Sequence, residues 1–465
     1  MRRLGTTAGL LAASLALVLW FSFGQTKEPD FKPVPPPFNS EVVPSRPLFV
    51  ASSSCAGQAC HGRAATDPLP QSAWETQKDD ERWRSSYTVW RTFDPHARAY
   101  AILHEPASIR IAQRLWGLNV KAHEDRRCLA CHSDPANVAR IDHDSPTEGV
   151  GCRSCHGDSS FWIDTHAGWP QGPGHTAHAI QNGLRDLSNV RVRSEMCASC
   201  HVGEPASVGI PLRDMNHDMI AAGHPRLNFD YATYVRALPP HWVEKNRNFS
   251  PPKLRPPGEE LAHWLVGRAT TNAASLRLLG DRAQRGAWPE LAEFDCYACH
   301  HDLSPQNRQS AGLLNWSGPP LLEPLLTLSG NHNLTASTNE LRGHLRKPAQ
   351  SAAIAKAAEH SAISWQAQTD RWTINSPPGR IVAQSLAEFP PHRWDDACHL
   401  YYSLLTMSRV HRPSRPQLME QGIQKIRSAL LLPRHIQDTR FQSPKGFDPE
   451  QLPFRDLLRS EARPD

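Results

Sequence analysis

The pattern of apolar residues along the chain predicts a mainly α-helical protein built from short helices and long loops. Residues 259–280 follow Pro-Pro-Gly, open with two acidic residues and end at a glycine, which are helix start and stop signals. Residues 82–118 also have helical spacing, with breaks at Pro95 and Pro106. Strand-like alternation is rare. One face of the segment 259–280 carries the apolar residues Leu261, Leu265, Ala269, Ala273 and Leu276.

The N-terminus has the pattern of an export signal, because an uncharged apolar stretch over residues 6–23 follows Arg2 and Arg3. About 18 apolar residues can just span a bilayer, which favours a retained anchor, whereas Ser22-Phe23-Gly24 is an acceptable cleavage site. Residues 1–24 are therefore predicted as a signal peptide or N-terminal membrane anchor. Residues 25–50 are rich in proline and are predicted as a linker. The rest of the chain is expected in the periplasm or another extracytoplasmic space, where a retained anchor would hold it at the inner membrane.

Composition narrows the class of protein. The 465 residues include 41 prolines and 24 histidines, and the mean hydropathy is −0.52. The net charge is +5, and there is no basic run interleaved with aromatic residues, which argues against nucleic acid as a partner. All but one of the 11 cysteines lie between residues 52 and 301. Residues 51–302 are therefore predicted as a cysteine-rich domain, and residues 303–465 as a helical C-terminal region.

Four segments of the cysteine-rich domain match C-x-x-C-H, in which two thiols add to the vinyl groups of one haem and the histidine binds its iron. Zinc sites and disulfides also use closely spaced cysteines, but neither requires a histidine directly after the second cysteine. The sequence therefore predicts covalent haem c with proximal ligands His132, His156, His201 and His300. The attached cysteines are Cys128 and Cys131, Cys152 and Cys155, Cys197 and Cys200, and Cys296 and Cys299.

A fifth site is predicted at SSSCAGQACHG, residues 52–62, where four residues rather than two separate Cys55 from Cys60. His61 follows the second cysteine as in the other motifs, and small residues fill the longer loop. A disulfide between Cys55 and Cys60 is the alternative, which would leave four haems instead of five. Cys398 also precedes a histidine, but Asp395 stands where the first cysteine would be. Its helical neighbours are apolar, so Cys398 is expected to be a small buried residue.

Each haem with two histidine ligands needs a second, distal histidine from elsewhere in the chain. His217 and His224 are seven residues apart, nearly two helical turns, and so are expected to share one face of a helix. His96 begins a helical run after Pro95, and His166 lies among aromatic residues. These four are the predicted distal ligands. The reserve candidates are His104, His123, His143, His175, His178 and His263.

These motifs resemble the multihaem cytochromes c related to the tetrahaem electron carriers of nitrifying bacteria, a superfamily that includes hydroxylamine oxidoreductase. The resemblance covers a little over half the chain and is carried by DPHARAYAIL, CLACH, EGVGCRSCHG, CASCHVG, NHDMIAAGHPRL and DCYACHHDL. It implies a mainly helical fold wrapped around packed haems, some in stacked pairs, with two histidines on most irons. It also supports His96, His166, His217 and His224 as ligands. The match weakens after about residue 330, and five sites rather than four make a transfer of individual haem roles unsafe.

Two functions follow from this pattern. The first is an electron carrier between a redox donor protein and an acceptor protein, because two histidines on an iron leave no position for substrate. The second is an enzyme that acts on a small nitrogen compound at one haem with an open position. Neither a C-x-x-C-K site nor an obvious cross-linking tyrosine is present, which favours the carrier; a structural haem scaffold in a larger complex is a third alternative.

Overall fold

The computed structural model describes most of the chain after residue 50, and these residues belong to one compact unit, Leu48–Asp465. The predicted signal or anchor, the proline-rich linker, His143 and the motif Cys296–His300 lie outside the described residues, as do both sides of the expected boundary between residues 302 and 303. The described residues are 51–64, 83–134, 138, 148–159, 162–169, 175–239, 241, 257–294, 316, 318–347, 350–389, 391, 393–410, 416–430 and 452–461.

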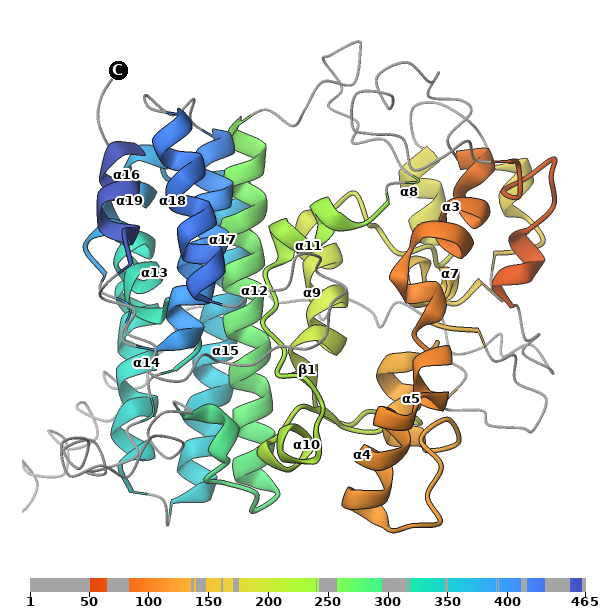
Figure 1. Ribbon diagram of the computed structural model, residues 1–465, viewed down its shortest axis with the longest axis horizontal. Helices are drawn as coiled ribbons and strands as arrows, with labels where there is room; N and C mark the ends of the chain where they lie inside the picture. The colour runs from red at the N-terminus through yellow and green to blue at the C-terminus, as the bar shows by residue number, and fades with distance from the viewer. Residues whose placement is uncertain are drawn as a thin grey trace, which may run out of the picture. The chain divides into compact units, whose positions relative to one another are not determined.

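The fold is mainly α, as predicted, and short helices alternate with loops in its N-terminal half (Figure 1). The expected breaks within residues 82–118 are confirmed, because helices stop at Phe93 and His104 and new ones begin at Pro95 and Pro106. The elements are η1 (Ser52–Cys55), η3 (Trp83–Ser85), α3 (Ser86–Phe93), η4 (Pro95–Arg98), η5 (Ala101–His104), α4 (Pro106–Trp116), α5 (Arg126–His132), α7 (Cys152–His156), η7 (His166–Gly168), α8 (His175–Gln181), α9 (Val190–His201), α10 (His217–Ala222) and α11 (Tyr231–Ala237).

The C-terminal half consists of longer helices. The predicted helix over residues 259–280 is confirmed within α12, and the five residues named for its apolar face are all buried. Cys398 is fully buried in the same core, as its spacing predicted. The elements are α12 (Pro257–Gln284), η8 (Leu291–Glu293), α13 (Leu322–Ser329), α14 (His332–Leu345), α15 (Ser351–Ile374), α16 (Gly379–Ala387), α17 (Trp394–Val410), α18 (Pro416–Ala429) and α19 (Phe454–Glu461).

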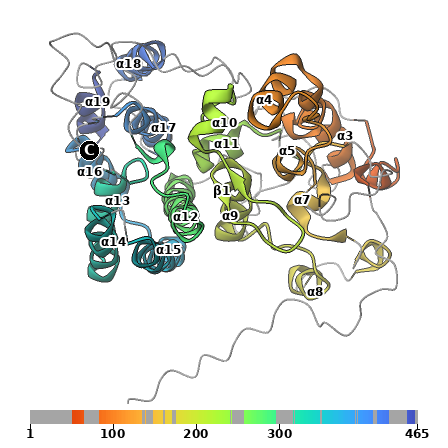
Figure 2. The ribbon, with the colours of Figure 1, turned by 90° about the horizontal axis from the view of Figure 1, so that it is seen from below.

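Helix α12 joins the two halves of the fold. It packs along α15 over most of its length, and the two helices lie side by side in both views (Figures 1 and 2). On other faces α12 contacts α17 and the motif helix α9. Trp264 and Trp365, both without exposed surface, are the largest fully buried side chains of the shared core. The burial of this apolar surface stabilises the bundle, so the C-terminal helices hold α9 in place.

The strands are two residues long and serve only to pin a loop. Strand β1 (Gly203–Glu204) follows α9 directly and pairs antiparallel with β2 (Arg213–Asp214). The pairing brings the chain back beside α9 just before α10 begins. In the described part of the chain, no helix is both long and apolar enough to span a bilayer.

One expectation about α10 is wrong. His217 is the first residue of this helix, but the helix ends at Ala222, so His224 does not share its face. Gly223 adopts a left-handed conformation with φ of 114°, and its N–H and that of His224 both donate to carbonyls of the last turn. A glycine tolerates this conformation because it has no Cβ, and this is a common way for a helix to stop.

Candidate haem-binding site

Three of the C-x-x-C-H motifs lie at the C-terminal ends of α5, α7 and α9, and each helix ends on its motif histidine. In a helix, residues at positions i, i+3 and i+4 lie on one face, so both thiols and the imidazole point to the same side. Two of the helices start at capped positions: the side chain of Asp125 accepts from the N–H of Arg127, and that of Asn189 accepts from the N–H groups of Arg191 and Val192. The local sequence therefore builds the attachment geometry itself.

The first site is built from a short 3-10 turn and a tight loop. The carbonyl of Gly57 accepts from the N–H groups of Cys60 and Gly62, which folds the longer spacer back on itself. Cys55 and Cys60 are free thiols and are not joined to each other. The Glu148 carboxylate accepts from the N–H of Ser52 at 2.6 Å. Through this contact the first site is tied to the segment that leads into the third motif.

Four motif histidines each face a histidine from a distant segment. The ring centres of these pairs are 6.0 to 6.3 Å apart. The ring planes are nearly parallel in the first pair, at 13°, and lie at 57° to 83° in the others. The pairs are His61 with His166, His201 with His96, His132 with His224, and His156 with His241.

This separation fits two imidazoles on opposite sides of one metal ion. Metal–nitrogen bonds of about 2.0–2.1 Å, added to a ring radius of roughly 1.15 Å on each side, put the two ring centres about 6.3–6.5 Å apart. Directly stacked rings come closer, as His104 and His123 show with centres 4.1 Å apart. The ring separations of the four pairs are therefore compatible with one metal ion between the two rings of each pair.

Hydrogen bonds orient at least five of these eight rings. The Nδ1 atoms of His61, His132, His166 and His224 lie 2.7 to 2.9 Å from backbone carbonyl oxygens. The fifth, His96, has a carboxylate partner instead. Metal-binding histidines usually donate one ring N–H to such an acceptor, which fixes the tautomer and leaves the other nitrogen for the metal. The rings are thus held with Nε2 available.

Burial keeps the inner imidazoles neutral. It lowers the pKa of His156 and of His224 to about 4 and the pKa of His201 to about 3, because desolvation disfavours the charged ring. The neutral form is the one that binds a metal ion. At neutral pH these three rings are therefore ready to act as ligands without losing a proton.

Asp94 is the acceptor for His96. Its Oδ1 lies 2.8 Å from Nδ1 of His96 and also accepts from the backbone N–H of the same residue at 2.9 Å. Burial disfavours the charged imidazole, but the hydrogen bond and negative charge of Asp94 outweigh it, so the pKa of His96 is raised. Burial raises the pKa of Cys155, and the negative charge of Asp94 raises it further. Burial lowers the pKa of His241, and the charge of Asp94 acts in the opposite direction.

The histidine pairs surround one large cavity of about 2690 Å³. Pockets for single small molecules usually measure about 300–1000 Å³, so this space suits several flat macrocycles. Seven of the eight paired histidines line it: His61, His96, His132, His156, His201, His224 and His241. The histidine pairs thus face a common interior.

Thiols of different motifs also contact each other, and one of these contacts, between Cys131 and Cys200, lies at the cavity wall. Cys55 hydrogen-bonds Cys152, and Cys131 hydrogen-bonds Cys200. The first motif therefore lies against the third, and the second against the fourth. In the described part of the chain, no group of three or more His, Cys, Asp or Glu residues could hold a metal ion by itself, whereas a structural zinc site uses four such ligands.

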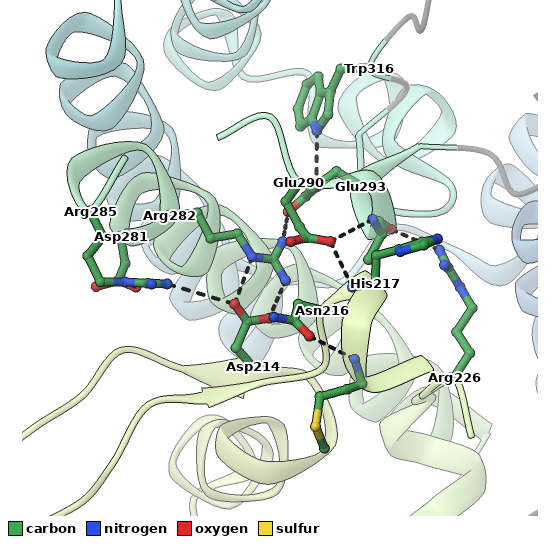
Figure 3. A network of polar contacts seen from close by, with 12 residues as sticks. Asp214, Asn216, His217, Arg226, Asp281, Arg282, Arg285, Glu290, Glu293 and Trp316 are labelled. Atoms are coloured by element: carbon green, nitrogen blue, oxygen red, sulfur yellow. Dashed lines mark hydrogen bonds and ion pairs between the residues drawn. The ribbon is translucent and has the colours of Figure 1, made fainter. Parts of the chain in front are cut away.

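His217 is held at the start of α10 by a contact of its backbone. Its N–H donates to Oε1 of Glu290 at 2.8 Å, and the same oxygen accepts from the N–H of Ala292 in η8. Figure 3 shows this contact within a wider network in which Arg282 bridges Asp214 and Glu293. The network holds η8 next to the start of α10. In the sequence, η8 ends shortly before the motif Cys296–His300.

His241 is the ligand candidate that sequence reasoning missed. It stands in Pro-Pro-His-Trp, outside any helical pattern, and its flanking prolines and tryptophan are the only local signal. Several reserve histidines have other ring contacts instead: His104 stacks on His123, His175 and His178 lie against Trp169, and His263 lies against Tyr231.

Comparison with known families supports a c-type cytochrome. Residues 80–157 match the family described as cytochrome c554 and c-prime. The matched segment contains the motifs at Cys128–His132 and Cys152–His156 as well as His96. No curated protein and no solved structure matches the chain. Covalently bound haem and electron transfer between redox partners are general properties of c-type cytochromes.

Proposed function

We propose that this chain is an extracytoplasmic electron carrier with five covalent haems, of which at least four have two histidine ligands. The observation that carries the proposal is the set of four histidine pairs with ring centres 6.0 to 6.3 Å apart, each joining a motif histidine to a distant one. All four motif histidines of the described chain have such a partner. The family match over residues 80–157 supports the same class of protein.

The motif cysteines and the paired histidines have separate roles in this proposal. The motif cysteines would hold each haem by two thioether bonds, and the paired histidines would bind its iron. Haem iron supplies one-electron chemistry by changing between its ferric and ferrous states. With two histidines on the iron, these four sites favour the transfer of electrons over the binding of a substrate. Contacts between motifs, such as Cys131 with Cys200, support short steps between neighbouring haems.

We assign His217 as the distal ligand of the fifth haem, whose proximal ligand is His300. The support is the hydrogen bond from His217 to Glu290, which ties the start of α10 to the chain just before Cys296. The alternative function, an enzyme for a small nitrogen compound, depends on this fifth iron having an open position. A membrane anchor or cleaved signal at residues 1–24 and redox proteins as donor and acceptor complete the proposal.

Intact mass and ligand binding test the proposed function. The mature chain is expected to carry five haems, and Cys55→Ala with Cys60→Ala is expected to reduce the count to four. All irons are expected to be low-spin and not to bind nitric oxide. If the unaltered protein and the double variant both carry four haems, the first site is not a haem site. A high-spin iron that binds nitric oxide in the unaltered protein would favour the enzyme.

A further inference from the structure

We infer that Asp94 lowers the reduction potential of the haem held between His96 and His201, acting through His96 as a positioning residue. The inference rests on the proposed function, because it requires a haem at this pair. The observation behind it is a difference among the histidines of this chain. Four other rings have a neutral carbonyl oxygen as their Nδ1 partner, whereas His96 has a carboxylate.

The hydrogen bond is well formed, and its carboxylate partner is buried. Only 7% of Asp94 is exposed, and Oδ1 lies 2.8 Å from Nδ1 of His96. The same oxygen accepts from the backbone N–H of His96, which caps η4 and fixes the residue at both its backbone and its ring. Within the described residues, the recorded ion pair of Asp94 is the one with His96, so no Arg or Lys neutralises its charge at close range.

Two physical effects act in the same direction. A carboxylate draws the Nδ1 proton toward itself, which makes the imidazole a stronger donor to the metal. A buried negative charge also acts in a medium of lower dielectric than water, so its field at the iron is weakly screened. Both effects stabilise the ferric state, which carries one positive charge more than the ferrous state. The electron is therefore harder to add at this haem.

The charge of Asp94 also reaches the neighbouring site. It adds to the burial that raises the pKa of Cys155 and opposes the burial that lowers the pKa of His241; these residues belong to the third motif and its histidine partner. No hydrogen bond joins Asp94 to those residues among the contacts of the described chain. The haem at His156 and His241 is therefore expected to feel the charge alone and to shift less than the haem at His96.

The substitution Asp94→Asn removes the charge and keeps an oxygen that can accept both hydrogen bonds. In the full haem-loaded protein, a redox titration followed by visible and EPR spectra is expected to show one component shifted upward. The expected change in its equilibrium is at least about tenfold, which is 59 mV for one electron. Asp186→Asn is the control, since Asp186 stands between the cavity-lining residues Arg185 and Leu187, and its side chain accepts hydrogen bonds from Ser188 rather than from a histidine.

Haem count and spin state are measured first on each variant. An unaltered protein without low-spin haems would refute the proposed function itself. Low-spin haems whose potentials do not change on the Asp94→Asn substitution would refute only the role of the carboxylate, as would an equal shift in the Asp186→Asn variant. If the Asp94→Asn variant loses haem, the Asp94→Glu variant is measured instead. It keeps the negative charge, so the reduction potential is expected to stay low. An upward shift equal to a tenfold change in the redox equilibrium would overturn the inference.

Discussion

His241 offers the sharpest test of the histidine pairs, because no helical spacing in the sequence marked it as a ligand. Its ring centre lies 6.3 Å from that of His156, at an angle of 57°. His241→Ala removes one of the two rings and leaves a gap on that side of the iron. The variant is expected to keep every covalent haem, since neither the cysteines nor His156 change.

The size of the effect follows from the number of sites. With five haems, one iron loses a ligand, so about one fifth of the low-spin ferric EPR intensity is expected to disappear and a high-spin signal of one iron per chain to replace it. That iron is expected to bind nitric oxide, and added imidazole is expected to restore the low-spin signal because it can fill the gap.

The control is His104→Ala. His104 is also a histidine of the N-terminal half, but its ring stacks on His123 at 4.1 Å, and His123 is not a motif histidine. Its removal is expected to leave the low-spin intensity unchanged. Full low-spin intensity in the His241 variant, or an equal loss in the His104 variant, would refute the assignment of ligands from ring separation.

The remaining predictions concern stability. Arg282→Met is expected to lower the free energy of unfolding by about 3–5 kcal/mol in urea, because Asp214 and Glu293 stay buried without their closest cation. Arg277→Met on the same helix is the control, and a similar loss in both would contradict this reasoning. Burial and the nearby Arg268 hold the pKa of His399 well below its usual value. Below about pH 6.5 the unfolded chain binds a proton at His399 that the folded chain does not bind. The free energy of unfolding therefore falls as the pH decreases from that value, by up to about 1.4 kcal/mol per pH unit. The free energy of unfolding in urea is measured at pH 7.5 and at pH 5.5 for the unaltered protein and for His399→Gln. The difference between the two pH values is expected to be smaller for the variant, and equal differences in the two proteins would contradict the prediction.

The haem-attachment residues could be predicted from the sequence because their chemistry is local. Two thiols and an imidazole must meet one macrocycle, and a spacing of three and four residues along one helical turn is enough to present them. The long apolar face of α12 and the burial of Cys398 were predictable for a related reason, since helical periodicity records which side of a helix packs inward.

The distal partners depend on the tertiary structure. His166 follows the third motif in the chain but faces His61 of the first, and His224 faces His132 across many intervening residues. Periodicity could not supply these pairs, and it misjudged His217 and His224 because Gly223 ends the helix between them.

Sequence alone determined the haem c cofactor and the helical class and predicted the covalent attachment sites, since each depends on spacing within a few residues. Only the tertiary structure decided which histidines face one another, that His241 is among them, and that a buried carboxylate at Asp94 acts on His96. Those features depend on how distant segments pack around a shared cavity, and no pattern along one segment records the position of another.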